Sequence, residues 1–285
     1  MNTSPRTFSL NFLISAFIVL LCLGACSAER KAVLFLDRYW PLGMKPEEEL
    51  ESLIAEAQRG AKARISALRM EGEDAPAFLA AYIENEKPEA VLLSAFAAME
   101  LRPLAENYPQ VRFCVFDAPK EGIPRQSPFI WVLFDAEPAI PELGAKIRGF
   151  LESSPPGSSA VAFLEPAWNS ISGLYPVFDG LPINLIQVSG DNTAEFVRGR
   201  TGGALSLKPV LYILSAGIHT SLIFDLIRQQ GGAGRIVLDE GAGIPAIEGF
   251  PVLASLERSY PKAIKTALLT EAARGEVLRI PVEIR

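Results

Sequence analysis

Short, continuous apolar runs alternate along this chain with stretches whose apolar positions repeat at helical spacing. The clearest example is the segment at residues 88–117. Its residues 90–93 and 111–116 are runs of the kind that a parallel sheet buries on both faces. Between them, residues 97–107 have near-helical spacing, and Pro109 is expected to stop that helix because proline lacks the N–H. Strand, helix and strand in about thirty residues make one βαβ unit.

The same alternation predicts further elements on both sides of this unit. Strands are expected at residues 32–36, 64–70, 129–134, 160–164, 183–188, 210–214, 235–238 and 252–253. Helices are expected from Pro46 to a cap at Gly60, and at residues 76–85, 138–151, 168–181, 194–199, 222–230 and 261–273. The SSPPGSS stretch at residues 153–159 separates two series of similar size. Two successive βα series predict an α/β fold of two Rossmann-like, doubly wound lobes with parallel strands.

Residues 1–25 have the pattern of a lipoprotein signal peptide. Arg6 supplies a positive charge, residues 12–23 are almost wholly apolar, and the LGAC sequence at residues 23–26 resembles a lipobox. The apolar run is short for a membrane span, which favours cleavage over an uncleaved anchor with an incidental cysteine. Lipid on Cys26 would tether the protein to a membrane of the cell envelope, facing the periplasm or the cell exterior.

The cysteines and the net charge argue against a disulfide, a zinc site and a nucleic-acid partner. Cys22 would leave with the signal peptide and Cys26 would carry lipid, so Cys114 has no disulfide partner and is expected in the core. One histidine and one remaining cysteine cannot make a conventional zinc site. The net charge of −6, without a basic block, argues against nucleic acid as a partner.

The sequence lacks the common catalytic motifs. It has no Gly-x-Ser-x-Gly elbow of a hydrolase. Gly241-Ala242-Gly243 follows an expected strand, but Pro245 interrupts the pattern of a dinucleotide-binding loop. We therefore expect a protein without catalysis, metal or cofactor. A hydrolase built on the same two lobes is an alternative.

Polar side chains directly follow several of the expected strands. Asp37, Asp117 and Asp239 each come after an apolar run, and Ser94 follows another. Ligands in open α/β sheets bind outside the carboxyl ends of the strands, so these side chains are candidate ligand contacts. Carboxylates there can accept hydrogen bonds from ligand hydroxyls. Helix capping, turn formation or solvation is the alternative.

Three aromatic residues and a glycine turn complete the candidate site. Trp40, Phe96 and Trp168 lie in expected loops after strands, where each could stack on a ligand or pack in the core. Gly217 and His219 lie in the turn after the strand at residues 210–214. His219 could contact a ligand or simply be a polar residue at a helix start.

Several segments together resemble the "basic membrane protein" family of bacterial substrate-binding lipoproteins. The run KPEAVLLSAFAAMELRPLAENYPQVRFCVFD is similar to its strand, small-residue loop, helix, Tyr-Pro pair and strand ending in Asp. FDAEPAIPELGAKIRGFL is similar to its strand and helix crossing into the second lobe, and VLYILSAGIHTSLIFDLIRQQG to its glycine turn and helix. VLASLERSYPKAIKTAL is similar to its final crossing strand and helix. The order and spacing of these pieces, together with the lipobox, carry the resemblance.

The resemblance implies a type I periplasmic-binding fold, in which two lobes joined by a hinge close over a ligand. The lobes would comprise residues 26–134 plus 252–273 and residues 135–251 plus 274–285. Nucleoside receptors of ABC importers belong to the family, which implies a monomer that binds a small, nucleoside-like polar molecule and docks on an ABC permease. It also makes Asp239 the leading ligand contact.

The chain departs from the family after its first strand. The family's nucleoside receptors carry Asp-x-Ser-Phe-Asn there, whereas this chain has Asp37-Arg38-Tyr39-Trp40-Pro41. A sensor or envelope interaction lipoprotein on the same fold, with no transport role, is therefore the alternative function.

Overall fold

The computed structural model describes most of the chain beyond the first 29 residues. The described residues are 30–37, 40, 42, 45–69, 74–117, 123, 126–165, 178–189, 191–216, 219–231, 234–239 and 250–285. The expected signal peptide, Cys26, Trp168 and Gly217 lie outside these ranges, so the structure does not bear on them.

In the described part of the chain, the strands form two six-stranded sheets. The first sheet has the order β2-β1-β3-β4-β5-β11 and the second the order β7-β6-β8-β9-β10-β12. The strand pairs are parallel except β10 with β12. The strands of the first sheet are β1 (Arg30–Leu36), β2 (Ala63–Arg69), β3 (Ala90–Ser94), β4 (Arg112–Phe116), β5 (Phe129–Asp135) and β11 (Val277–Pro281). Those of the second are β6 (Ala160–Leu164), β7 (Ile183–Gln187), β8 (Leu211–Ser215), β9 (Arg235–Asp239), β10 (Val252–Glu257) and β12 (Glu283–Ile284).

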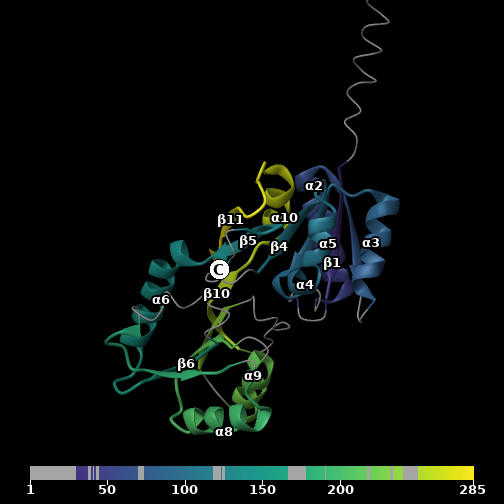
Figure 1. Cartoon of the computed structure of the whole chain (residues 1–285). Coiled ribbons are helices and arrows are strands. Elements are labelled where there is room, and N and C mark those ends of the chain that lie inside the picture. The colour runs from purple at the N-terminus through teal and green to yellow at the C-terminus, as the bar shows by residue number, and fades with distance from the viewer. Residues whose placement is uncertain are drawn as a thin grey trace, which may run out of the picture.

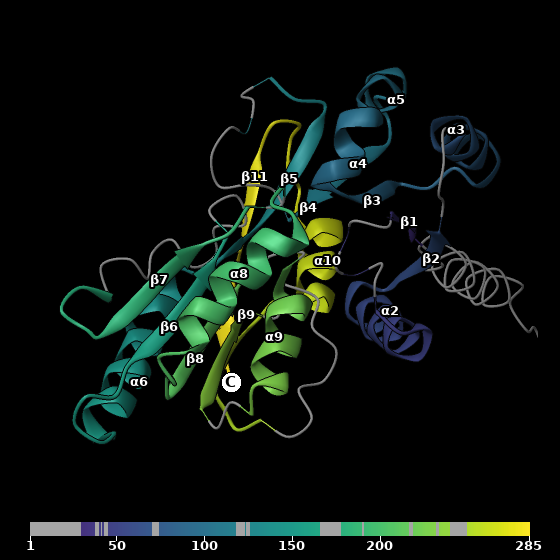
Figure 2. The same ribbon diagram turned by 90° about the horizontal axis from the view of Figure 1, so that it is seen from below.

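Helices cover both faces of each sheet. In the first lobe, α3 (Ala75–Glu86), α4 (Ala95–Glu100) and α5 (Arg102–Asn107) lie on one face, and α2 (Glu47–Ala61) and α10 (Tyr260–Leu269) pack together on the other. In the second lobe, α8 (Ala194–Leu205) and α9 (Thr220–Gln229) lie on one face and α6 (Ile140–Ser153) on the other (Figure 2). The two lobes are joined through β5, β10 and β11 (Figure 1). This arrangement confirms the expected α/β fold of two doubly wound lobes.

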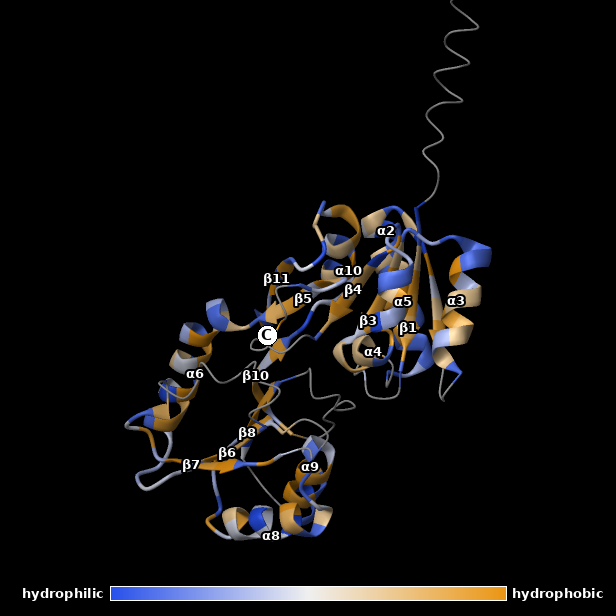
Figure 3. Cartoon of the chain, viewed as in Figure 1, coloured by the Kyte–Doolittle hydropathy of each residue, from blue (hydrophilic) through white to orange (hydrophobic). Residues whose placement is uncertain are grey.

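The apolar runs form strands because both of their faces are covered. Along β3, Val91 packs toward α3 and α4 while Leu92 packs in the core cluster that contains α2 and α10. All five residues of β3, β6 and β8 are buried. The hydropathy colouring shows the same contrast between apolar strands and helices with a polar side (Figure 3). None of the helices in the described ranges has the length and apolar character needed to cross a membrane.

The chain crosses between the lobes three times. The crossings lie between β5 and α6, between β10 and α10, and between β11 and β12. Strand pairing places Val252–Glu257 in the second sheet and Val277–Pro281 in the first. The sequence assigned residues 252–273 to the first lobe and 274–285 to the second, so both of these boundaries differ from the observed strand pairing. The cause is that β10 was expected to be short and β11 was not expected.

Several helix boundaries also differ from expectation. The helix expected at residues 97–107 is two helices that meet at Leu101, because Pro103 has no N–H to donate to the preceding turn. Helix α2 ends at Ala61, and its cap is not Gly60 but Lys62, which has a left-handed backbone (φ 50°). Helix α8 is longer than expected and α10 shorter.

Candidate functional site

The carboxyl ends of the central strands carry the same pattern of side chains in both lobes. Each lobe places an acid, a serine and an acid at the ends of three adjacent strands, which are β1, β3 and β4 in the first lobe and β6, β8 and β9 in the second. The first row is Asp37, Ser94 and Asp117, and the second is Glu165, Ser215 and Asp239. Each row spans the point where the strand order reverses, which is where open α/β sheets bind ligands.

Each serine donates a hydrogen bond to an acid of its own row. Ser94 Oγ donates to Asp37 and also accepts from the Ala97 N–H at 3.0 Å, so it caps α4. Ser215 Oγ donates to Asp239 Oδ2 at 3.0 Å. The strand ends therefore hold their carboxylates in fixed positions.

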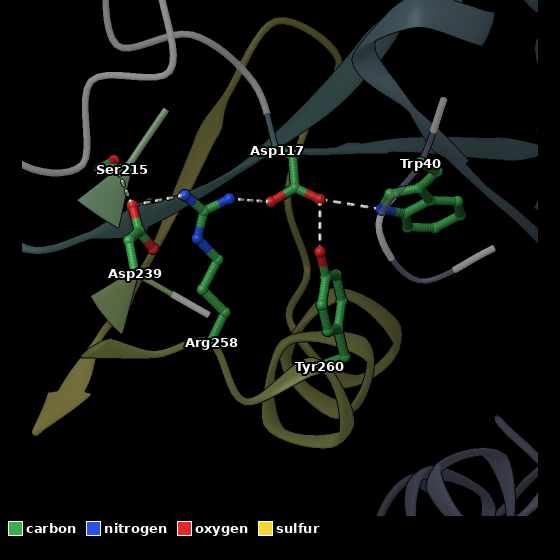
Figure 4. Close-up of polar contacts among 6 residues, drawn as sticks. All are labelled: Trp40, Asp117, Ser215, Asp239, Arg258 and Tyr260. Carbon is green, nitrogen blue, oxygen red and sulfur yellow. Dashed lines mark hydrogen bonds and ion pairs between the residues drawn. The ribbon is translucent and has the colours of Figure 1, made fainter. Parts of the chain in front are cut away.

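Asp117 accepts from three donors of the protein itself (Figure 4). Trp40 Nε1 donates to Oδ2 at 2.8 Å, Tyr260 OH donates to Oδ2 at 2.7 Å, and Arg258 Nη1 donates to Oδ1 at 2.8 Å. Asp117 follows β4 directly and has a left-handed backbone, with φ at 54°. This conformation is uncommon outside glycine, although aspartate tolerates it better than most residues. Such an outlier is typical of a position where side-chain placement matters.

Arg258 connects the two rows. It follows β10, and its Nη2 lies 3.5 Å from Asp239 Oδ2 while Nη1 binds Asp117. The arginine side chain is 7% exposed and the two carboxylate side chains 3%. Its guanidinium carbon also lies 5.8 Å from the centre of the Phe134 ring. A buried cation is thus shared by a carboxylate of each lobe.

Burial and neighbouring charges determine the protonation states of Arg258 and Tyr260. Burial alone lowers the pKa of Arg258, but the charges of Asp239 and Asp117 outweigh it and raise that pKa above its ordinary value. Burial, followed by the nearby charge of Asp117, raises the pKa of Tyr260 well above its ordinary value. Arg258 is therefore a permanent cation here, and Tyr260 a permanent hydrogen-bond donor.

The predicted aromatic residues lie in different environments. Trp40 is 1% exposed, and its ring packs against Phe116 and Tyr260, with centroids 5.7 and 6.2 Å away. In this arrangement its ring is packed in the core and its Nε1 donates to Asp117. Phe96 lies in the first turn of α4, two residues after Ser94, and is 41% exposed.

His219 lies in a buried position at the start of α9. Its Nε2 is 3.0 Å from the carbonyl oxygen of Ser189, and its backbone N–H donates to Ala216 O. These contacts connect the loop after β7 to the start of α9. The structure thus gives His219 a clear structural contact at the rim of the second row.

The sequence predicted strand-end positions for Asp37, Ser94, Asp117 and Asp239. It did not predict four other members of the cluster. Glu165 and Ser215 directly follow expected strands, so the same rule could have found them. Arg258 and Tyr260 were hidden because the strand at residues 252–253 was expected to end before Arg258 could follow it.

The chemistry of the cluster is ion pairing and hydrogen bonding to polar groups. Among the described residues, no three histidine, cysteine, aspartate or glutamate side chains are placed to hold a metal ion. The carboxylates, hydroxyls and guanidinium at the strand ends suit a ligand with hydroxyl or amine groups.

No protein-family model and no curated protein matches the sequence. Many solved structures match the fold. An ABC transporter solute-binding protein from Aeropyrum pernix K1 has a TM-score of 0.59 at 13% identity, over 89% of this chain and 76% of that one. A transcriptional activator of the comK gene from Bacillus halodurans has a TM-score of 0.64 at 13% identity, over 90% and 89%. A Mycobacterium smegmatis protein in complex with β-D-fucofuranose has a TM-score of 0.57 at 13% identity, over 90% and 91%.

These similarities show the fold. The chain has the two-lobed architecture of type I periplasmic-binding proteins. Those structures are described as a solute-binding protein, a transcriptional activator and a sugar transporter.

Proposed function

We propose that this protein is an extracytoplasmic substrate-binding lipoprotein of an ABC importer, related to the basic membrane protein family. Its lobes close over a small polar ligand, with a nucleoside-like molecule favoured, and no chemistry follows. The observation that carries the proposal is the pair of acid–serine–acid rows at the strand ends of the two lobes. Such rows offer directional acceptors from both sides of a ligand.

Within this proposal, the exposed ring of Phe96 takes the planar face of the ligand. Asp37, Asp239 and the serines accept or donate hydrogen bonds to its polar edge. Trp168, Gly217 and His219 remain candidate contacts on the second lobe. The mature protein is a monomer anchored by lipid on Cys26, and the closed lobes form the surface that an ABC permease binds.

A thermal-shift screen of the full chain in detergent tests ligand binding. Nucleosides, nucleobases, sugars and amino acids are each added in large excess. A ligand at a hundred times its dissociation constant adds about 2.7 kcal/mol of stability, which is a readable shift in the melting temperature. A nucleoside response supports the favoured ligand class, and a sugar response keeps the fold and replaces the substrate.

Asp239→Ala locates the site once a ligand is found. The ligand-induced shift, measured from the melting temperature of each variant alone, is expected to disappear in this variant. Asp225→Ala is the matched control, because Asp225 is exposed on α9 and pairs only at the surface with Arg228. An undiminished shift in Asp239→Ala would remove Asp239 from the site.

One observation favours a second function, that of a non-transport sensor or envelope interaction lipoprotein. Three donors of the protein already satisfy Asp117, so this carboxylate has little capacity left for a ligand. A well-folded protein that responds to no compound of the panel would support this alternative over import.

A further inference from the structure

The crossing between β10 and α10 carries the contact that spans the two lobes. Arg258 lies on this crossing, Asp117 directly follows β4 in the first lobe, and Asp239 ends β9 in the second (Figure 4). All three side chains are buried. In a hinge motion, the lobes rotate about the segments that connect them. A bridge at this place therefore restricts the angle between the lobes.

The two halves of the bridge are unequal. Arg258 Nη1 donates to Asp117 Oδ1 at 2.8 Å, which is a charge-assisted hydrogen bond, whereas Nη2 lies 3.5 Å from Asp239 Oδ2. Tyr260 also donates to Asp117, and it begins α10, which packs against α2 in the first lobe. The backbone of Arg258 directly follows β10 of the second sheet, so its guanidinium reaches from the second lobe to Asp117 of the first.

We propose that Arg258 is a positioning residue that latches the lobes and sets their resting angle. Asp239, on the neighbouring strand of the second sheet, holds the guanidinium in the orientation in which it binds Asp117 of the first lobe. Ser215 in turn donates a hydrogen bond to Asp239. The latch operates without any ligand, so it goes beyond the proposed function and does not depend on it.

Substitutions on the two sides of the bridge separate this role from a general contribution to folding. Lysine keeps the positive charge of Arg258 but lacks the planar fork that reaches two carboxylates at once, so Arg258→Lys is expected to keep one contact and lose the bridge. Asp239→Asn removes the negative charge of the Asp239 side chain and keeps a similar shape. Glu257→Gln is the matched control, because Glu257 precedes Arg258 directly but pairs with Arg285 inside the second lobe.

The test measures the distance between the lobes by pulsed electron spin resonance on the full chain in detergent, with no ligand added. Spin labels are placed at Glu56→Cys on α2 and Arg198→Cys on α8, two exposed positions. Cys22 and Cys26 are replaced by serine, and buried Cys114 does not label.

The unsubstituted protein and Glu257→Gln are expected to give the same narrow distribution of distances. Asp239→Asn and Arg258→Lys are expected to give broader distributions shifted away from it. Far-UV circular dichroism verifies that each variant is folded, and Asp239→Asn decides the matter alone if Arg258→Lys does not fold. Distributions of unchanged width and mean in folded Asp239→Asn would overturn the latch.

Discussion

The two lobes follow the same plan but end their central strands differently. In both, an acid, a serine and an acid lie at adjacent strand ends. Asp239 is the last residue of β9 and lies beside Ser215, which donates to it at 3.0 Å. Asp117 lies one residue beyond β4 with a left-handed backbone, and it accepts from side chains distant in the sequence. The first-lobe acid is therefore held at short distance by side chains distant in the sequence, whereas the second-lobe acid has its short hydrogen bond from the neighbouring strand and a longer contact with Arg258.

The crossings show the same asymmetry. Strand β5 ends in Asp135, which pairs with Arg279 of the edge strand β11. Strand β10 ends in Glu257, which pairs with Arg285, directly after the edge strand β12. The residue after Asp135 is a buried alanine, whereas the residue after Glu257 is Arg258. A single difference at equivalent positions of a repeated fold thus creates the contact between the lobes.

The largest expected effect is on the free energy of unfolding when Asp117 is replaced. Asp117→Ala leaves the buried guanidinium of Arg258 without its nearer carboxylate and removes the acceptor of two further donors. Breaking a buried ion pair in this way costs about 3–5 kcal/mol. Asp239→Ala is expected to cost less, about 1–3 kcal/mol, because Asp239 lies 3.5 Å from Arg258, whereas Asp117 accepts from it at 2.8 Å.

Urea unfolding of the full chain, followed by circular dichroism, measures both changes. Asp225→Ala, at an exposed ion pair, is expected to change stability by about 0.5 kcal/mol or less. Equal losses for Asp117→Ala and Asp239→Ala would contradict the view that the two lobes hold their acids differently.

Removing one hydrogen-bond donor from Asp117 and one from Asp239 compares the two acids again, with smaller expected losses of stability. Tyr260→Phe keeps the ring that packs on Trp40 and Phe134 and loses only the hydroxyl that donates to Asp117. Hydrogen bonds to charged groups contribute about 1.5–3 kcal/mol, so a loss in this range is expected. Ser215→Ala also removes a donor to a carboxylate, but its hydrogen bond to Asp239 is 3.0 Å long against 2.7 Å for that of Tyr260, so the loss is expected at the lower end. Urea midpoints of the two variants test the order, and a larger loss for Ser215→Ala would reverse it.

Much of the fold is predictable because its strands are buried on both faces. A buried parallel strand must be a continuous apolar run, and β1, β3, β4 and β6 are such runs in the sequence. Edge strands are less constrained. In β11 only one residue is fully buried, so its sequence does not stand out, and the lobe boundaries that depend on it were misplaced.

The site was predictable only where it depends on position along a strand. Asp117 and Asp239 follow apolar runs, and the rule for open sheets locates them. The contact between them depends on Arg258, which is distant from Asp117 in the sequence and becomes a neighbour only when the chain crosses back. Trp40 shows the same limit, because nothing local distinguishes a ring that holds a carboxylate from one that stacks on a ligand.

The smallest expected effect is on the reaction rate of the Cys114 thiol. Cys114 lies in the first lobe, so its rate reports on that lobe alone. Burial raises the pKa of Cys114 to about 12, so its thiol is expected to react slowly with a disulfide reagent near pH 8. Asp117→Ala is expected to speed this reaction because it opens the first lobe, whereas Asp239→Ala leaves the rate near that of the unsubstituted protein. Because the pKa is raised on folding, the unfolded chain loses its proton first, and stability is expected to fall steadily as pH rises from about 9 toward 12. Equal reaction rates in the two variants would mean that the lobes open together rather than independently.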